Sequence, residues 1–155
     1  MLIRNDKQRE HSVALLTTMQ AEAKKFKKKL QGEGKTRKEV KELLDPMLSQ
    51  YEDVKVDIET YDRWKSGDLT DFEAADLDQV GIFIIAARIA QGISQRELAE
   101  MLEVNESTVS RDERNDYHGI TIVRAVKILK VLGCSVVMDV WPQRILPPPH
   151  PDAVP

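Results

Sequence analysis

Two short helices joined by a tight turn are encoded by Gly92-Ile-Ser-Gln-Arg-Glu-Leu-Ala-Glu-Met-Leu-Glu-Val-Asn-Glu-Ser-Thr-Val-Ser-Arg-Asp-Glu113. Ser94 and Glu97 have the spacing of a capping box, which satisfies two free backbone N–H groups at a helix start. The apolar residues that follow at helical spacing are Leu98, Ala99 and Leu102. Asn105 is the expected cap of the second helix, whose only strongly apolar residue is Val109. Because this helix has so little apolar surface, we expect its outer side to contact another molecule.

The wider segment from Val80 to Gly133 resembles the lambda-repressor-like (Xre-type) helix-turn-helix family of prokaryotic DNA-binding proteins. The matching residues are Ala87-Arg88, Gly92-x-Ser94-Gln95-x-x-Leu98-Ala99, Val104-x-x-Ser107-x-Val109-Ser110-Arg111-x-Glu113 and Leu129-x-x-Leu132-Gly133. They cover about a third of the chain in unbroken order. The sequence departs from the family at Asp112, where an aromatic or aliphatic residue is common. It departs again at residues 114–119, which stand between Glu113 and the next helix.

The resemblance implies which side chains meet DNA. Those expected to reach base edges in the major groove are Asn105, Glu106, Ser107 and, one turn later, Arg111. Arg111 has the chemistry to pair with guanine and Glu106 to accept from cytosine, although Glu106 also fits an acid that the helix dipole favours. Gln95 is expected to clamp a phosphate, or else to be a solvated helix start. Thr108 and Ser110 are further candidate phosphate donors.

A structural role is implied for Arg88 and Glu113. By the same resemblance they form an ion pair that ties the first helix of the domain to the end of the recognition helix. Removal of one partner would leave a poorly solvated charge, so we expect it to reduce stability.

The composition fits one domain, or one small domain with an appendage, in 155 residues. Charged residues make up 32% and aromatic residues 5%, a balance typical of helix-rich soluble proteins. A net charge of -3 is unfavourable for general nucleic-acid binding, so we expect sequence-specific, dimer-dependent binding. No apolar run is long enough to span a bilayer, so no membrane partner is expected. The single Cys134 fits a reducing cytoplasm.

The N-terminal extension, residues 1–70, carries two apolar seams with alternating steps of three and four. The first seam lies in an expected helix over 7–30 and comprises Leu16, Met19, Ala23, Phe26 and Leu30. After the break at Gln31-Gly32-Glu33-Gly34, we expect a short helix over 36–44 and a new helix that begins at Asp45-Pro46. The second seam comprises Met47, Tyr51, Val54, Ile58 and Tyr61. The two seams predict either an antiparallel helical hairpin or a dimerising coiled coil.

The remaining organisation follows from caps and breaks. The helix-turn-helix domain occupies 77–133, with helices expected over 77–91, 95–103, 106–114 and 121–132. Segment 134–143 contains a β-branched stretch, 135–141, that predicts one strand paired with the same strand of a second copy. The Pro-rich tail, 144–155, should be extended and disordered. The expected fold is therefore all-α with one C-terminal dimerising strand.

No motif of an enzyme active site is visible: no glycine-rich phosphate loop, no nucleophile elbow, no paired acid and base. We expect no enzyme activity and no cofactor. His11, His118 and His150 lack metal-ligand spacing, so no metal site is expected either. The basic run Lys24–Lys29 could contact DNA or a partner, but a solvated helix face is the favoured interpretation.

Together these features predict a homodimeric, sequence-specific transcriptional regulator that binds double-stranded DNA, by default a repressor. Two recognition helices about one DNA turn apart require an inverted-repeat operator. Two alternatives stay open. The helical extension and the tail resemble the layout of HigA-type antitoxins, in which a segment outside the DNA-binding domain binds a toxin and the complex represses its own operon. A protein-interaction module without DNA binding would fit the acidic balance.

Overall fold

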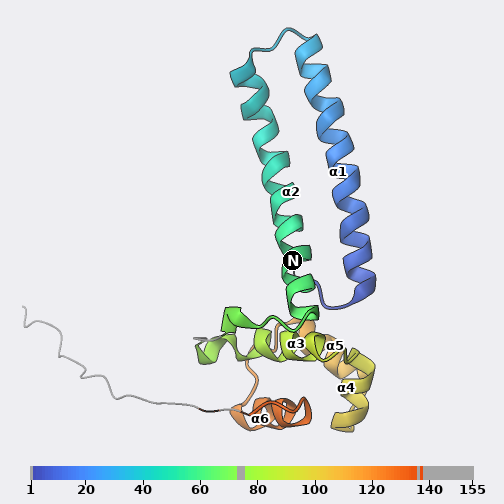
Figure 1. The fold of residues 1–155 in the computed structure, drawn as a ribbon, viewed down its shortest axis with the longest axis vertical. Coiled ribbons are helices and arrows are strands. Elements are labelled where there is room, and N and C mark those ends of the chain that lie inside the picture. Colours follow the sequence, from blue (N-terminus) through green and yellow to red (C-terminus); the bar gives the residue numbers. More distant parts are fainter. Residues whose placement is uncertain (1, 73–75, 136, 138–155) are drawn as a thin grey trace, which may run out of the picture.

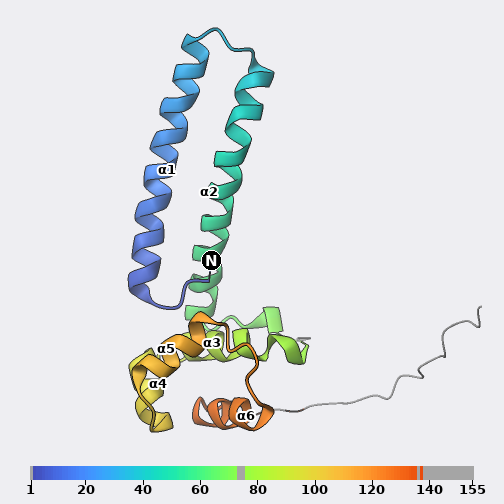
Figure 2. The same cartoon turned by 180° about the vertical axis from the view of Figure 1, so that it is seen from behind.

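The computed structural model describes residues 2–72, 76–135 and 137, and every regular element in them is helical. Two long antiparallel helices, α1 (Asp6–Gly32) and α2 (Arg37–Lys65), form a hairpin that stands on a group of shorter helices (Figure 1). The shorter elements are the 3-10 turns η1 (Thr70–Phe72) and η2 (Leu77–Gln79) and the helices α3 (Val80–Ala90), α4 (Gln95–Leu102), α5 (Glu106–Arg114) and α6 (Ile122–Val131). Seen from both sides, α3 lies between the hairpin and α6 (Figure 2).

The start of the second long helix differs from the prediction. The expected break at Asp45-Pro46 is wrong, because α2 runs without interruption from its capping box at Thr36 and Glu39 and contains Pro46 in its interior. Proline has no amide hydrogen to donate to the carbonyl one turn earlier in the helix. Because Pro46 is exposed, water can donate a hydrogen bond to that carbonyl instead. Continuity also lets one helix bury Leu44 near one end and Ile58 near the other.

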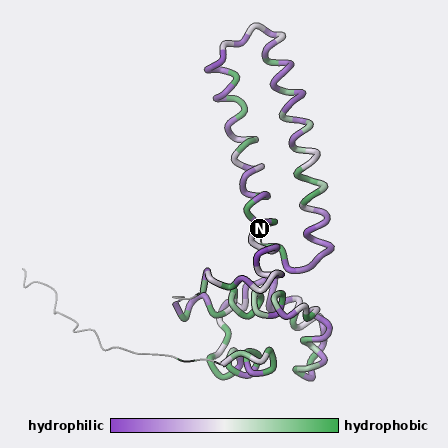
Figure 3. The backbone as a smooth tube through the Cα atoms, viewed as in Figure 1, coloured by the Kyte–Doolittle hydropathy of each residue, from purple (hydrophilic) through white to green (hydrophobic). Residues whose placement is uncertain are grey.

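The hairpin buries its seams well at both ends and only partly in the middle. Leu30, Val40 and Leu44 form a small cluster at the tip, while Ile58, Tyr61 and Trp64 belong to the main core at the base. Between these ends the seam residues are half-buried: Leu16, Met19, Ala23 and Phe26 on α1, and Met47, Tyr51 and Val54 on α2. Most of the hairpin is hydrophilic, with hydrophobic residues recurring along it (Figure 3).

The main core lies around α3, in which every residue from Ile84 to Ile89 is buried. Ile84 and Ile85 are fully buried among residues of α4, α5 and α6. The base of the hairpin and Ile3, which is 1% exposed, join the same core. The hairpin is therefore packed against the shorter helices rather than tethered to them. In the described ranges no single helix is both long and apolar enough to cross a membrane.

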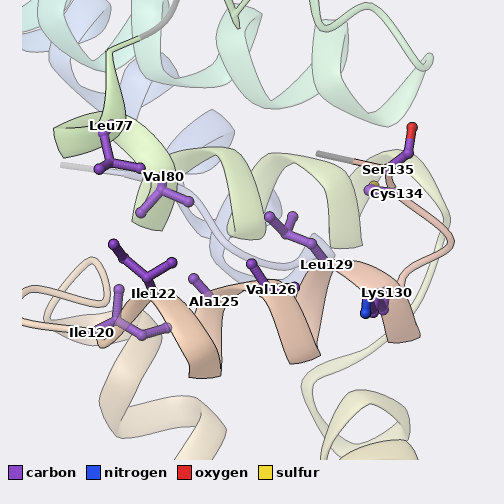
Figure 4. A pocket seen from close by; sticks show the side chains of 10 residues that line it. All are labelled: Leu77, Val80, Ile120, Ile122, Ala125, Val126, Leu129, Lys130, Cys134 and Ser135. Carbon is purple, nitrogen blue, oxygen red and sulfur yellow. The ribbon is translucent and has the colours of Figure 1, made fainter. Parts of the chain in front are cut away.

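The shorter helices lie close to their expected positions, with two differences. The helix expected over 77–91 is divided into η2 and α3. The strand expected over 135–141 lies outside the described residues except for Ser135 and Val137, which have no strand assignment, and the tail over 144–155 lies wholly outside them. After α6, Cys134 and Ser135 line an apolar groove of about 630 Å³ between η2–α3 and α6 (Figure 4).

Candidate nucleic-acid interface

The start of α4 is set by the capping box that the sequence predicts. The Glu97 backbone N–H donates to Ser94 Oγ at 3.1 Å, and the Ser94 backbone N–H donates to Glu97 Oε2 at 2.7 Å. That second hydrogen bond lowers the pKa of Glu97, because it favours the ionised carboxylate. α4 ends at Glu103, whose left-handed backbone (φ 58°, ψ 42°) turns the chain toward α5. The capping box and this turn therefore fix the two ends of α4.

One buried apolar residue, Val109, anchors α5 to the core. The candidate base-reading residues Asn105, Glu106, Ser107 and Arg111 are all exposed on α5 or at its start. Thr108 and Ser110 are half-buried. Asn105 occupies the N-cap position as expected, but its side chain makes no capping hydrogen bond.

The charge on the exposed part of α5 is mostly positive. Arg111 and Arg114 are both exposed, and neither has an ion-pair partner among the described residues. Glu106 is the one acid in the first turn of the helix. An arginine whose charge is not neutralised within the protein remains available to a phosphate or a guanine edge.

A buried charged network holds α5 in place. Arg88 is 3% exposed and Glu113 is 0% exposed, and they form a bidentate ion pair with Nε–Oε1 of 2.5 Å and Nη2–Oε2 of 2.7 Å. Gln95 Nε2 donates to the same Oε2 at 2.7 Å. The amide that was expected to clamp a phosphate is therefore bound to Glu113 in this structure. The network joins the end of α3, the start of α4 and the end of α5.

The N-terminal segment reaches the same region, which the sequence did not indicate. Arg88 Nη2 donates to the Arg4 carbonyl at 2.9 Å, and Arg4 Nε donates to the Glu113 carbonyl at 2.8 Å. Arg4 also pairs with Asp116 at 2.6 Å. Residues 2–4 thereby connect the hairpin to the end of α5. A sequence pattern gives no signal for this, because the contacts join residues 84 to 112 positions apart.

A polar groove of about 320 Å³ lies at the start of α4. Its basic lining residues come from the N-terminal segment, α2, α3 and α4: Arg4, Lys65, Arg88 and Arg96. The sequence does not indicate that Lys65 and Arg96 belong to this groove, because their position beside Gln95 depends on how the hairpin and α4 pack together. Lys65 pairs with Asp6, and Arg96 pairs with Glu100 at 3.0 Å. The described residues contain no group of three His, Cys, Asp or Glu side chains that could hold a metal ion.

In comparison with protein families, residues 84–137 match a family model described as helix-turn-helix. Comparison with curated proteins finds no match, and comparison with solved structures finds none. The matched segment contains most of α3 and the whole of α4, α5 and α6. Residues 84–137 are thus a lambda-repressor-like (Xre-type) helix-turn-helix domain, the kind found in DNA-binding regulators.

Proposed function

We propose that the protein is a sequence-specific transcriptional repressor that binds an inverted-repeat operator as a homodimer. The observation that carries this proposal is Arg111, which is exposed and has no ion-pair partner in the part of the chain that the structure describes, on a helix with one apolar anchor within a helix-turn-helix domain. A helix of this kind fits the major groove, and its outward side chains can meet base edges. Repression follows if the operator overlaps a promoter.

The residue roles divide according to burial. Arg111 is proposed to read guanine, with Asn105, Glu106 and Ser107 as neighbouring base or phosphate contacts. The phosphate contact near Gln95 is proposed to use the first-turn N–H groups of α4 and the guanidinium of Arg96, since the Gln95 amide is bound to Glu113. Half-buried Thr108 and Ser110 are proposed as secondary phosphate donors. Arg88 and Glu113 are positioning residues, because both are buried.

Fluorescence anisotropy on two labelled duplexes tests the proposal. One duplex is the DNA upstream of the protein's own gene and the other is a shuffled version, each measured at two salt concentrations. We expect a preference of about a thousandfold or more for the upstream duplex. Equal, strongly salt-dependent binding of both duplexes would contradict sequence-specific recognition.

Charge reversal at α5 separates DNA reading from a pure interaction role. Arg111→Glu should abolish the preference for the upstream duplex, because it replaces the base-reading cation with an anion. Lys7→Glu is the matched control: it makes the same change of charge at an exposed residue of α1 that lies outside the helix-turn-helix domain and has no ion-pair partner among the described residues. Equal loss in both variants would show that net charge, rather than the α5 surface, determines binding.

A further inference from the structure

We propose that a second copy of this chain packs, in the antiparallel direction, against one open side of the hairpin. The inference rests on the proposed homodimer and identifies its interface. It also assigns a role to the basic run Lys24–Lys29, which the DNA-binding domain does not use.

The open side is an apolar groove of about 320 Å³ between the two long helices. Met19, Gln20, Ala23, Lys24 and Lys27 of α1 line it, with Leu44, Met47, Leu48 and Tyr51 of α2. Leu48 is 47% exposed, and the seam residues Met19, Met47 and Tyr51 are only half-buried. Two helices cannot enclose a seam by themselves, whereas four helices can, as in a helical bundle. A second hairpin therefore has the shape and the apolar surface needed to fill the groove.

The levels of the charged residues along the hairpin follow from one hydrogen bond. Gln20 Nε2 donates to Tyr51 Oη at 2.7 Å, so these two residues lie at one level. From this level, Lys24 and Lys27 lie about one and two turns toward the tip. On α2, Glu52 adjoins Tyr51, and Glu59 lies about two turns farther toward the base. Both acids share the helix face of Leu48, because their spacing from it follows the helical repeat.

Charge determines the direction of packing. The tip segment, residues 24–41, contains nine Lys or Arg and two Glu, a net charge of +7. Segment 52–62 contains five Asp or Glu and one Lys, a net charge of -4. A parallel pair would place one basic tip against the other. An antiparallel pair, with its two-fold axis near the level of Gln20 and Tyr51, places each tip beside the acidic segment of the partner.

Individual side chains fit this arrangement. Lys24 and Lys27 have no ion-pair partner among the described residues. Across the two-fold axis they lie near Glu52 and Glu59, whose side chains are 62% and 61% exposed. Within the described ranges both acids pair with the same cation, Lys55, at 3.7 and 3.8 Å, so each retains room for a second one.

The antiparallel dimer carries its two helix-turn-helix domains at opposite ends. Each hairpin base is about 14 residues of helix from the axis, which separates the two bases by about 40 Å. The recognition helices lie beyond these bases. The operator half-sites should therefore be separated by more than the about 34 Å of one DNA turn.

Paired charge reversals on the full chain test the interface, without DNA, by light scattering coupled to size exclusion. Lys24→Glu/Lys27→Glu and Glu52→Lys/Glu59→Lys should each weaken the dimer at least about tenfold, because each makes like charges face one another. Mixing the two variants should restore a dimer with one chain of each kind. Lys25→Glu/Lys28→Glu is the matched control, since these residues do not line the groove. All the substituted residues are exposed, and circular dichroism checks that the fold is retained.

Disulfide trapping in a Cys134→Ser background tests the direction. A mixture of Lys27→Cys and Glu59→Cys chains should form a disulfide between unlike chains, and Lys27→Cys alone should not cross-link. Self-cross-linking of Lys27→Cys would overturn the antiparallel direction. A wild-type monomer would overturn the interface. A dimer insensitive to both charge reversals would overturn it too, and would indicate dimerisation through the groove of Figure 4 instead. Loss of DNA binding alone would overturn only the proposed function.

Discussion

Replacement of Arg88 by methionine should be one of the most destabilising single changes in this protein. The substitution keeps most of the side-chain length but removes four hydrogen bonds: two to Glu113, one to the Ile93 carbonyl and one to the Arg4 carbonyl. The Glu113 carboxylate would stay buried with Gln95 as its remaining side-chain donor. Removing one partner of such a pair costs about 3–5 kcal/mol in the free energy of unfolding.

Urea denaturation followed by circular dichroism measures this cost. Arg96→Met is the matched control, because Arg96 and Glu100 are 75% and 64% exposed and such pairs contribute less than about 1 kcal/mol. The double variant Arg88→Met/Glu113→Leu removes both charges together and should recover at least about 2 kcal/mol of the loss. Two results would contradict a stabilising buried pair: a cost of Arg88→Met no greater than that of Arg96→Met, or a double variant less stable than Arg88→Met.

Two further predictions concern close packing and pH. Gly81→Ala should destabilise the fold by about 1–3 kcal/mol, since a Cβ there would lie 2.0 Å from the Asp116 carbonyl oxygen. Gly32→Ala, which adds a Cβ in open space on α1, should not destabilise it. Unfolding curves of the two variants measure the difference. Burial, and then a hydrogen bond to Asp6, raises the pKa of Tyr61 to about 12. The neutral phenol thus stabilises the fold fully below pH about 10, and this contribution is lost as the pH rises toward 12. Between pH 8 and pH 11 the wild type should lose more stability than Tyr61→Phe, and equal losses would contradict the assignment.

The sequence predicts well those elements that are determined by residues close together in the chain. Ser94 and Glu97 identify the start of α4, because both partners of a capping box lie within one turn. The two apolar seams locate the long helices, but a seam does not say whether its partner lies in the same chain. The break at Pro46 was predicted wrongly because the sequence does not show that this residue is exposed.

The parts that depend on distant contacts could not be predicted. Gln95 donates to Glu113 of the next helix, which takes its amide away from the role that the family resemblance implies. Tyr117 is 4% exposed although it lies in a polar loop. The carbonyl of its neighbour Asp116 lies so close to Gly81 that a side chain at Gly81 would clash with it. Ile3 enters the main core from the end of the chain. Each of these positions is set by packing between elements and leaves no periodic pattern.

Selection of duplexes from a randomised pool, followed by sequencing, tests most directly whether the exposed face of α5 reads DNA. For the wild type we expect enrichment of one inverted repeat. With Arg111→Glu, enrichment at the base that Arg111 contacts should disappear, while Lys7→Glu should select the same repeat as the wild type. The absence of any enriched sequence with the wild type, or an unchanged repeat with Arg111→Glu, would contradict the account.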